Sequence, residues 1–173
     1  SGAVFERPDM SLHEASLAKL ERICLKLQLS PEDHLLEIGT GWGGFALHAA
    51  SHYGCRVTTT TISREQFEFA KKRVADAGLE DRVTLLLCDY RDLEGQYDKL
   101  VSIEMIEAVG HEYLDSYFGK CAELLKPEGM MLLLVLGVLG WPGGRHVPDA
   151  GAAQGASSQR AHGGHGPAGE DCH

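Results

Sequence analysis

The chain has 173 residues, enough to bury the core of a single domain, and its 43% hydrophobic and 24% charged residues are ordinary for a globular protein. Its 16 Lys and Arg face 25 Asp and Glu, and the formal net charge of −9 argues against nucleic acid as an electrostatic partner. An anionic membrane would also repel the chain on average, although a local basic patch would still allow docking.

The cysteines and the apolar runs favour a cytoplasmic protein. No Cys-x-x-Cys pair occurs, and we predict that the scattered thiols are reduced and buried. They are Cys24, Cys55, Cys88, Cys121 and Cys172. No signal peptide is recognised, and the longest apolar run, residues 130–139, has half the length of a membrane span. We therefore expect a cytoplasmic location, with room for peripheral contact at the inner membrane surface.

Helical and strand patterns alternate along the chain. Ser11 and Glu14 have the spacing of a capping box and predict the start of the first helix. The predicted helices cover residues 12–29, 43–53, 64–77 and 112–125. The predicted strands cover residues 35–38, 56–60, 83–87 and 100–103, and a fifth begins at residue 130. This alternation predicts an α/β fold, a doubly wound, mainly parallel, Rossmann-like sheet with helices on both faces.

The first strand runs into a glycine turn and then into a helix, an arrangement typical of nucleotide sites. Gly39, Gly41 and Gly44 satisfy G-x-G-x-x-G, which alone is a weak signal for NAD or FAD. Glu37, two residues before the first glycine, instead suits S-adenosylmethionine, because the sulfonium and ammonium groups of that cofactor are cationic. The turn therefore leaves two ligand classes open.

The end of the second strand helps to decide between them. A dinucleotide fold places an Asp or Glu about 20 residues after the glycines, where it holds the ribose hydroxyls. Here the strand ends in threonines, Thr60 and Thr61, and Ser63 and Gln66 follow with the spacing of a second capping box. The missing acidic residue disfavours a nicotinamide oxidoreductase.

Two further segments are expected at the same edge of the sheet, where ligands of doubly wound folds bind. After the third strand, Asp89 is placed to accept a hydrogen bond from an adenine amino group, and the Tyr90 backbone to serve a ring nitrogen. Alternatively, Asp89 and Asp92 cap the short turn that leads to Leu93. After the fourth strand come residues 104–107.

Four motifs in this order, residues 36–45, 61–66, 89–92 and 107–110, resemble the cyclopropane-fatty-acyl-phospholipid synthase family. Its members are S-adenosylmethionine-dependent methyltransferases, related to the mycolic acid cyclopropane synthases. The likeness covers residues 1–133 and implies a class I methyltransferase core. Residues 1–5 also resemble the Tyr-Ser-Cys-Ala segment that lies near the cofactor in this family, with Gly2 in place of the cysteine.

The motifs and the resemblance together define an expected cofactor site. It comprises Ser1, Glu37, Gly39, Thr40, Gly41, Trp42, Gly43, Thr61, Ser63, Gln66, Asp89 and Tyr90. No metal site is expected, because the spacing of the histidines near the C-terminus among flexible glycines does not suit a metal.

The resemblance implies methyl transfer to an alkene in the acyl chain of a membrane phospholipid. A carbocation forms, and a bound bicarbonate removes a proton so that the ring closes, which requires a dry site with anionic groups. By resemblance, Glu107 is the catalytic carboxylate that helps to hold bicarbonate. Its alternative role is to cap, or to form a salt bridge with, the helix beyond Gly110.

The chain also departs from the family pattern. Ala108 stands where the family has a histidine, and Leu134 stands where it has histidine or glutamine. An aliphatic side chain cannot bind bicarbonate. The remaining strands and the acyl-binding segment of the family have no counterpart, so we expect a core that is incomplete at its C-terminal side.

Composition changes abruptly at residue 137. Ten of the 21 glycines lie in residues 137–173, and no apolar periodicity continues there. We expect a cofactor-binding domain over residues 1–136 and a disordered Gly/Ala-rich tail over residues 137–173, as a truncation or a shifted reading frame would produce.

The sequence therefore predicts a lipid methyltransferase that is inactive as given and in which an exposed sheet edge permits homo-oligomers. Three alternatives remain. The acceptor of the methyl group is a small amine rather than a phospholipid acyl chain, the chain is a non-catalytic cofactor-binding fragment, or, least favoured, it is an oxidoreductase.

Overall fold

The computed structural model describes residues 2–135, which form one parallel sheet with helices on both sides. The strand order is β3-β2-β1-β4-β5, and every neighbouring pair is parallel. The strands are β1 (His34–Ile38), β2 (Arg56–Thr61), β3 (Val83–Leu87), β4 (Tyr97–Ile103) and β5 (Leu125–Leu134). This architecture confirms the predicted fold class.

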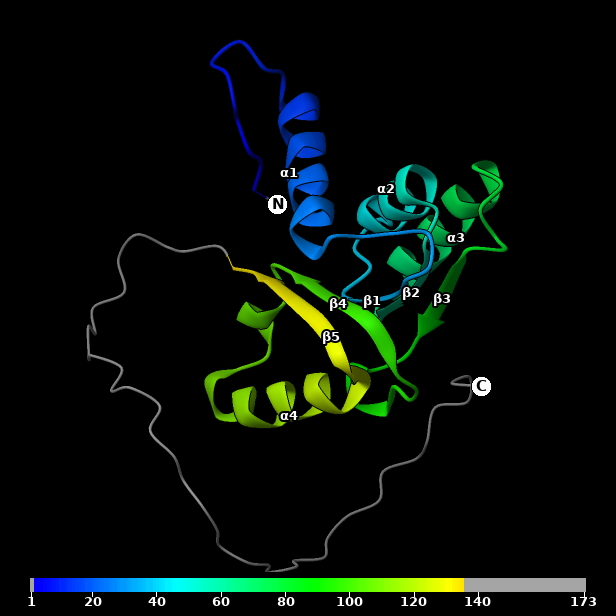
Figure 1. Ribbon diagram of the computed structural model, residues 1–173, viewed down its shortest axis with the longest axis vertical. Helices are drawn as coiled ribbons and strands as arrows, with labels where there is room; N and C mark the ends of the chain where they lie inside the picture. The colour runs from blue at the N-terminus through cyan, green and yellow to red at the C-terminus, as the bar shows by residue number, and fades with distance from the viewer. Residues whose placement is uncertain (1, 136–173) are drawn as a thin grey trace, which may run out of the picture. The chain divides into compact units, whose positions relative to one another are not determined.

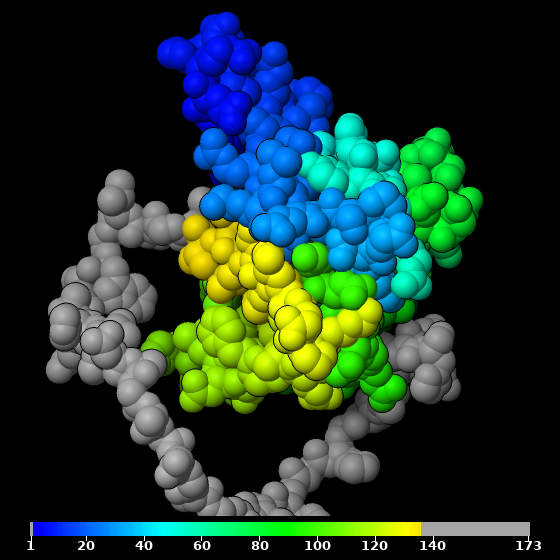
Figure 2. Space-filling view, in the orientation of Figure 1, coloured from blue at the N-terminus to red at the C-terminus, as the bar shows by residue number. Residues whose placement is uncertain are grey.

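The helices form two layers (Figure 1). On one side of the sheet lie α1 (Leu12–Leu27), α2 (Gly44–Tyr53) and α3 (Arg64–Asp76), and on the other side lies α4 (Leu114–Leu124). Three short 3₁₀ turns, η1 (Tyr90–Asp92), η2 (Ile106–Ala108) and η3 (His111–Tyr113), follow β3 and β4. In the space-filling view, β5 is at the surface between α1 and α4 (Figure 2).

The chain order places the carboxyl ends of all strands at one edge of the sheet. From β1 the chain builds outward through β2 to β3, and then crosses back to β4 on the other side of β1. The strand order therefore reverses between β1 and β4, and ligands of doubly wound folds bind at such a reversal.

The hydrophobic core has one part on each face of the sheet. Leu35 contributes to the part beneath α1 and α2, whereas Leu36 contributes to the part beneath α4, and both are fully buried. Neighbouring strand residues face opposite sides, so a strand that is covered on both faces must be apolar throughout. Residues 35–38 follow this rule except at Glu37, the one acidic residue among them.

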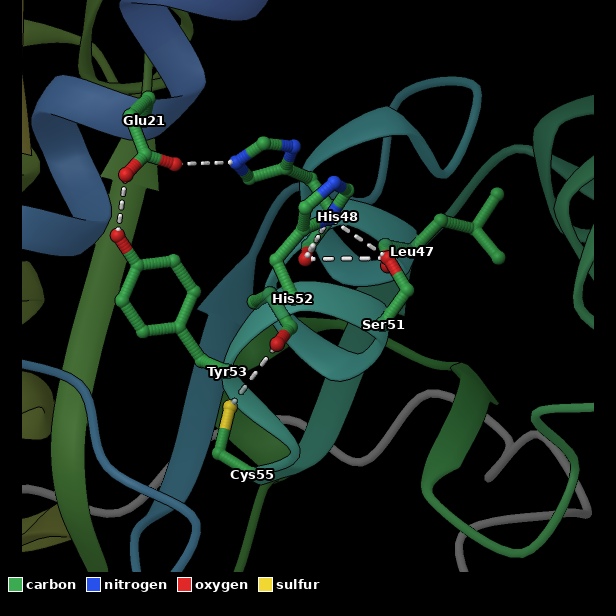
Figure 3. Close-up of polar contacts among 8 residues, drawn as sticks. Glu21, Leu47, His48, Ser51, His52, Tyr53 and Cys55 are labelled. Carbon is green, nitrogen blue, oxygen red and sulfur yellow. Dashed lines mark hydrogen bonds and ion pairs between the residues drawn. The ribbon is translucent and has the colours of Figure 1, made fainter.

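A polar contact joins α1 to α2 (Figure 3). The Tyr53 hydroxyl donates a 2.7 Å hydrogen bond to the Glu21 carboxylate, and His48 Nε2 lies 3.0 Å from the other carboxylate oxygen. The rings of His48 and His52 stack with their centroids 4.3 Å apart. The hydrogen bond from Tyr53, followed by that from His48, lowers the pKa of Glu21, so the Glu21 carboxylate is ionised at neutral pH.

The two predicted helix caps have different outcomes. At α1 both halves of the capping box form between Ser11 and Glu14, as predicted. At α3 the Ser63 hydroxyl accepts from the Gln66 N–H at 3.3 Å, but the Gln66 side-chain oxygen accepts from the Thr61 hydroxyl at 2.8 Å. The Ser63 N–H donates to that same hydroxyl at 3.1 Å, so the second capping box was wrong in its reciprocal half.

Several predicted boundaries shift, among them the end of α1, which lies at Leu27, and the starts of β4, α4 and β5. Gly110, with φ +79°, is the N-cap of the turn η3 (His111–Tyr113), and α4 follows this turn, so it begins two residues later than predicted. β5 begins at Leu125, opposite Tyr97, and its register slips before Met130 pairs with Lys99. The predicted strand start at residue 130 is therefore where regular pairing begins rather than where the strand begins.

Ser1 and the proposed tail, residues 137–173, lie outside the described residues, as does Cys172. The division of the chain into two domains therefore stays a prediction. Within residues 2–135 no helix is long and apolar enough to cross a membrane.

Candidate functional site

A pocket of about 600 Å³ opens at the carboxyl edge of the sheet. Its walls come from the ends of β1 and β2, from the turns after β3 and β4, and from the start of α4. Five of the predicted cofactor residues line it: Gly39, Thr61, Gln66, Asp89 and Tyr90. The sequence motifs thus converge from four separate segments on one cavity.

The glycine turn requires backbone conformations that side chains disfavour. Gly39, Gly41 and Gly43 have φ values of +102°, +52° and +77°. The N–H groups of Gly39 and Thr40 both donate to the carbonyl oxygen of Thr60, at 3.1 and 2.9 Å. These bonds fix the turn to the end of β2, and glycine supplies the necessary freedom.

Glu37 lies beneath the turn and is only 2% exposed. Its carboxylate accepts a 2.7 Å hydrogen bond from Thr59, whose hydroxyl is 2.7 Å from that of Thr40. Burial raises the pKa of Glu37 to about 8, opposed by the hydrogen bond from Thr59. Glu37 does not belong to the pocket lining, but this relay of hydroxyls connects it to the glycine turn.

Trp42 and Gly43 pack toward α3 rather than into the pocket. Trp42 is 57% exposed, and its ring meets Phe69 edge to face with the centroids 5.3 Å apart. The Trp42 carbonyl accepts a 2.7 Å hydrogen bond from Arg73. A Cβ on Gly43 would lie 3.0 Å from the Cβ of Ala70, so this glycine allows the turn to approach α3 closely.

Asp89 lines the pocket and also caps η1, which was the alternative role predicted for it. Its carboxylate accepts from the Arg91 N–H at 2.9 Å and from the Arg91 guanidinium at 2.9 and 2.7 Å. The side-chain hydrogen bonds from Arg91 are the main reason why the pKa of Asp89 is lowered. Asp89 is therefore an ionised acceptor at the pocket wall.

The segment after β4 was expected at this edge, but its apolar residues were not predicted to form a wall of the site. Met105, Val109 and Tyr113 line the pocket, and Met105 Cγ would lie 3.4 Å from a Cβ on Gly39. Apolar pocket walls give the same sequence signal as core residues, so nothing in the pattern distinguishes them. Glu107 is exposed in η2, next to Ala108, which lines the pocket.

Cys88 corrects the prediction that the cysteines are buried fillers. Cys24, Cys55 and Cys121 are buried free thiols, as predicted, but Cys88 is only partly buried and lines the pocket. The Thr60 hydroxyl donates to its carbonyl oxygen at 2.7 Å. This residue follows the last residue of β3, so it belongs to the ligand edge.

Ser63 is the N-cap of α3 and lies outside the pocket lining. Thr40 and Gly41 belong to the glycine turn and are also outside the lining. Leu134 lines a second, smaller cavity beside α1, together with Val4 and Ile23. The position at which the resemblance implies a polar group is thus occupied by an aliphatic side chain that contributes to a different cavity.

Comparison with known proteins identifies the relatives of this fold. Residues 1–140 match the family model described as mycolic acid cyclopropane synthetase. The chain belongs to this family. The match covers all of the described residues and confirms the predicted resemblance.

Curated relatives agree with this membership. The chain is 48% identical over 127 residues to the cyclopropane-fatty-acyl-phospholipid synthase of Escherichia coli K12, which covers 73% of the chain and 32% of that protein. It is 44% identical over 118 residues to a tuberculostearic acid methyltransferase of Mycobacterium tuberculosis, covering 68% of the chain and 27% of that protein. The chain thus spans about a third of the length of these relatives.

Solved structures share the fold. A mycolic acid cyclopropane synthase complexed with S-adenosylhomocysteine (SAH) and CTAB superposes with a TM-score of 0.74 at 36% identity, over 77% of this chain and 47% of that one. A coclaurine N-methyltransferase bound to N-methylheliamine and SAH superposes with a TM-score of 0.71 at 29% identity, over 77% and 40%. The described residues therefore form the class I methyltransferase fold of the cyclopropane synthetase family.

Proposed function

We propose that the pocket binds S-adenosylmethionine and that this chain is the cofactor-binding part of a lipid methyltransferase. The observation that carries the proposal is the convergence of Gly39, Thr61, Gln66, Asp89 and Tyr90 on one cavity at the reversal of strand order. The SAH present in the related cyclopropane synthase structure supports the same ligand class.

The chemistry of the residues present fits a cationic cofactor. Glu37 is a buried carboxyl group, linked through Thr59 to the turn, and an approaching cation would stabilise its ionised form. Asp89, already ionised, presents hydrogen-bond acceptors to an amino group. The glycine turn lets the backbone approach a ligand closely at Gly39 and Gly41.

The other expected contacts, from Ser1, Thr40, Trp42, Gly43 and Ser63, belong to the same proposal. Of these, Thr40 is buried, and its N–H and hydroxyl both join the turn to β2, so its proposed role is to hold the turn in place. The exposed ring of Trp42, packed on Phe69, supplies a rigid rim to the turn instead of a pocket wall.

For the reaction we propose methyl transfer to an unsaturated acyl chain of a phospholipid at the cytoplasmic face of a membrane. The bound cofactor would supply the electrophilic methyl group. Glu107, beside the pocket residues Ala108 and Val109, is the proposed carboxylate near bicarbonate. The cyclopropane-fatty-acyl-phospholipid synthase of E. coli, at 48% identity, supports this substrate class.

An amine acceptor is the second candidate function. The structural likeness to coclaurine N-methyltransferase, at 29% identity, favours it. Ala108 and Leu134, which replace polar residues of the family pattern, also remove groups that only the bicarbonate mechanism would need. A fragment that binds the cofactor without catalysis is the third.

Self-association is also part of the proposal. Among the described residues β5 pairs with β4 alone, so its outer edge presents unpaired backbone groups. A second copy of the chain can add to such an edge.

Isothermal titration calorimetry with SAH, NADH and bicarbonate in turn tests the proposal. We expect SAH to bind and NADH not to bind. Binding of NADH in preference to SAH would overturn the assigned cofactor class, and absence of SAH binding would overturn the assigned pocket.

A further inference from the structure

Glu104 has a backbone conformation that its side chain does not favour. It directly follows β4 and has a φ of +56°. Among the described residues only one other non-glycine residue, Gln28 at the end of α1, has a positive φ. Such a conformation persists only where the surrounding contacts enforce it, and these residues are concentrated at functional sites.

The contacts that enforce it come from three other parts of the chain. The Glu104 N–H donates to the carbonyl oxygen of Leu134, the last residue of β5, at 2.8 Å. Its carboxylate accepts a 2.9 Å hydrogen bond from the N–H of Gly2 and lies 3.2 Å from the ammonium of Lys19. Glu104 thus joins the N-terminal segment, α1, β4 and β5.

The ion pair is buried. The side chains of Lys19 and Glu104 are only 7% and 12% exposed. Removal of a pair of charges from water is expensive, and replacement of such pairs by apolar residues often leaves stability unchanged or raises it. A buried ion pair at a strained residue therefore adds little to the stability of the fold. Its presence at this position needs a different explanation.

Glu104 also connects directly to the pocket. The next residue, Met105, lines the cavity and packs against Gly39 of the glycine turn. On the other side, the N–H of Val4 donates to the carbonyl oxygen of Ala15 at 3.0 Å, so the N-terminal segment lies along α1 (Figure 1). The carboxylate of Glu104 ties the start of this segment to the carboxyl end of β4.

We propose that Gly2, Lys19 and Glu104 form a clamp that positions Met105 at the cofactor pocket and holds the N-terminal segment against the carboxyl end of β4. Glu104 and Lys19 are then positioning residues. The clamp restricts the motion of the pocket residues before a ligand binds, so less conformational entropy is lost on binding. This inference rests on the proposed binding of S-adenosylmethionine in the pocket.

The test compares stability with affinity. The double variant Lys19→Met/Glu104→Gly removes both charges and gives position 104 a residue that adopts positive φ freely. We expect a thermal midpoint equal to or above that of the parent, but SAH binding weaker by about tenfold. We also expect faster hydrogen exchange at the N–H of Val4. If the clamp contributed only to folding, the SAH affinity would not fall while the thermal midpoint stayed the same or rose.

Gln28→Gly is the matched control. It relieves the other positive φ of a non-glycine residue, at the end of α1 and outside the pocket lining. We expect it to raise the thermal midpoint and to leave the SAH affinity unchanged. A double variant that binds SAH as tightly as the parent, or loses affinity only in proportion to stability, would overturn the clamp.

Hydrogen exchange in the parent chain keeps the proposal testable if the double variant does not fold. Saturating SAH should slow exchange at the N–H groups of Gly2 and Val4, and unchanged exchange would overturn the clamp. A parent chain that does not bind SAH would instead overturn the proposed function, so the two failures are distinguishable.

Discussion

Thr59 on β2 donates a 2.7 Å hydrogen bond to the buried carboxyl group of Glu37 on the adjacent strand β1. This single bond only partly offsets the loss of water, and burial raises the pKa of Glu37 to about 8. Around neutral pH the folded chain therefore retains a proton that the unfolded chain releases.

This difference gives the first prediction. Since the folded state binds the extra proton, the free energy of unfolding should fall as the pH rises from about 4.5 to about 8, by at most about 5 kcal/mol. The variant Glu37→Gln keeps the shape of the neutral acid and should not show this loss. Urea unfolding at pH 5.5 and pH 8.5 measures both chains, and equal pH dependence in the two would contradict the prediction.

The second prediction concerns proton release on binding. An ammonium group placed near the glycine turn would favour the ionised form of Glu37. SAH keeps the ammonium of the cofactor but not its sulfonium, so its binding at pH 7 should release up to about one proton. Calorimetry in buffers of different ionisation enthalpy measures this number. Glu37→Gln should release none, and equal release from both proteins would place the effect on another group.

The third prediction concerns the glycine turn. Gly41→Val puts a β-branched residue at φ +52°, which costs about 1–2 kcal/mol of stability, and it places a side chain where the backbone is expected to meet the ligand. Gly78→Val is the matched control, because Gly78 has φ +64° and nothing within 4 Å of an added Cβ, as at Gly41. Both variants should lose similar stability, but only Gly41→Val should lose SAH binding. Unchanged binding in Gly41→Val would show that the turn is not the cradle.

Much of this fold follows from local patterns. The β-branched run from Val57 to Thr60 and the alternation of helices with strands predict a parallel sheet, and the structure agrees. The start of β5 does not follow, since Pro127 and Gly129 give the signal of a turn. Contact across the sheet decides it: Lys126 forms a 2.6 Å ion pair with Asp98 and holds this irregular stretch against β4.

The site divides in the same way. Gly39, Thr61, Gln66 and Asp89 were predictable because their residue types carry a turn, cap or acceptor signal at known strand ends. The segment that contains Met105 was also expected at this edge, but the role of Met105 in the pocket wall was not predictable, because a methionine in a pocket wall has the same pattern as one in a core. The strained backbone of Glu104 also has no local signal, since it depends on Lys19 and Gly2, 85 and 102 residues away.

The fourth prediction concerns two buried hydroxyl groups. Tyr117 and Ser102 are fully buried, and within residues 2–135 neither hydroxyl oxygen makes a well-formed hydrogen bond, although the side chains of Ser102 and Cys121 are close enough to Tyr117 to affect its pKa. Tyr117→Phe removes an unsatisfied group and should change the free energy of unfolding by no more than about 0.5 kcal/mol. Tyr53→Phe is the control, because its hydroxyl donates to Glu21, and it should cost about 1–1.5 kcal/mol. Urea denaturation measures both, and a larger loss in Tyr117→Phe would mean that its hydroxyl is satisfied.

The last prediction is that this chain, as given, does not form cyclopropane rings although it binds the cofactor. Leu134 lies in the cavity beside α1 and offers no hydrogen bond to bicarbonate, and Glu107 is exposed to water. A carbocation needs a dry site, and loss of a general base alone costs about 10²–10⁴-fold in rate. Incubation with unsaturated phospholipid vesicles and methyl-labelled cofactor, followed by fatty-acid analysis, should give no labelled ring. Glu107→Gln provides the baseline, and labelled ring above it would show that the chain retains the full reaction and that Glu107 takes part in it.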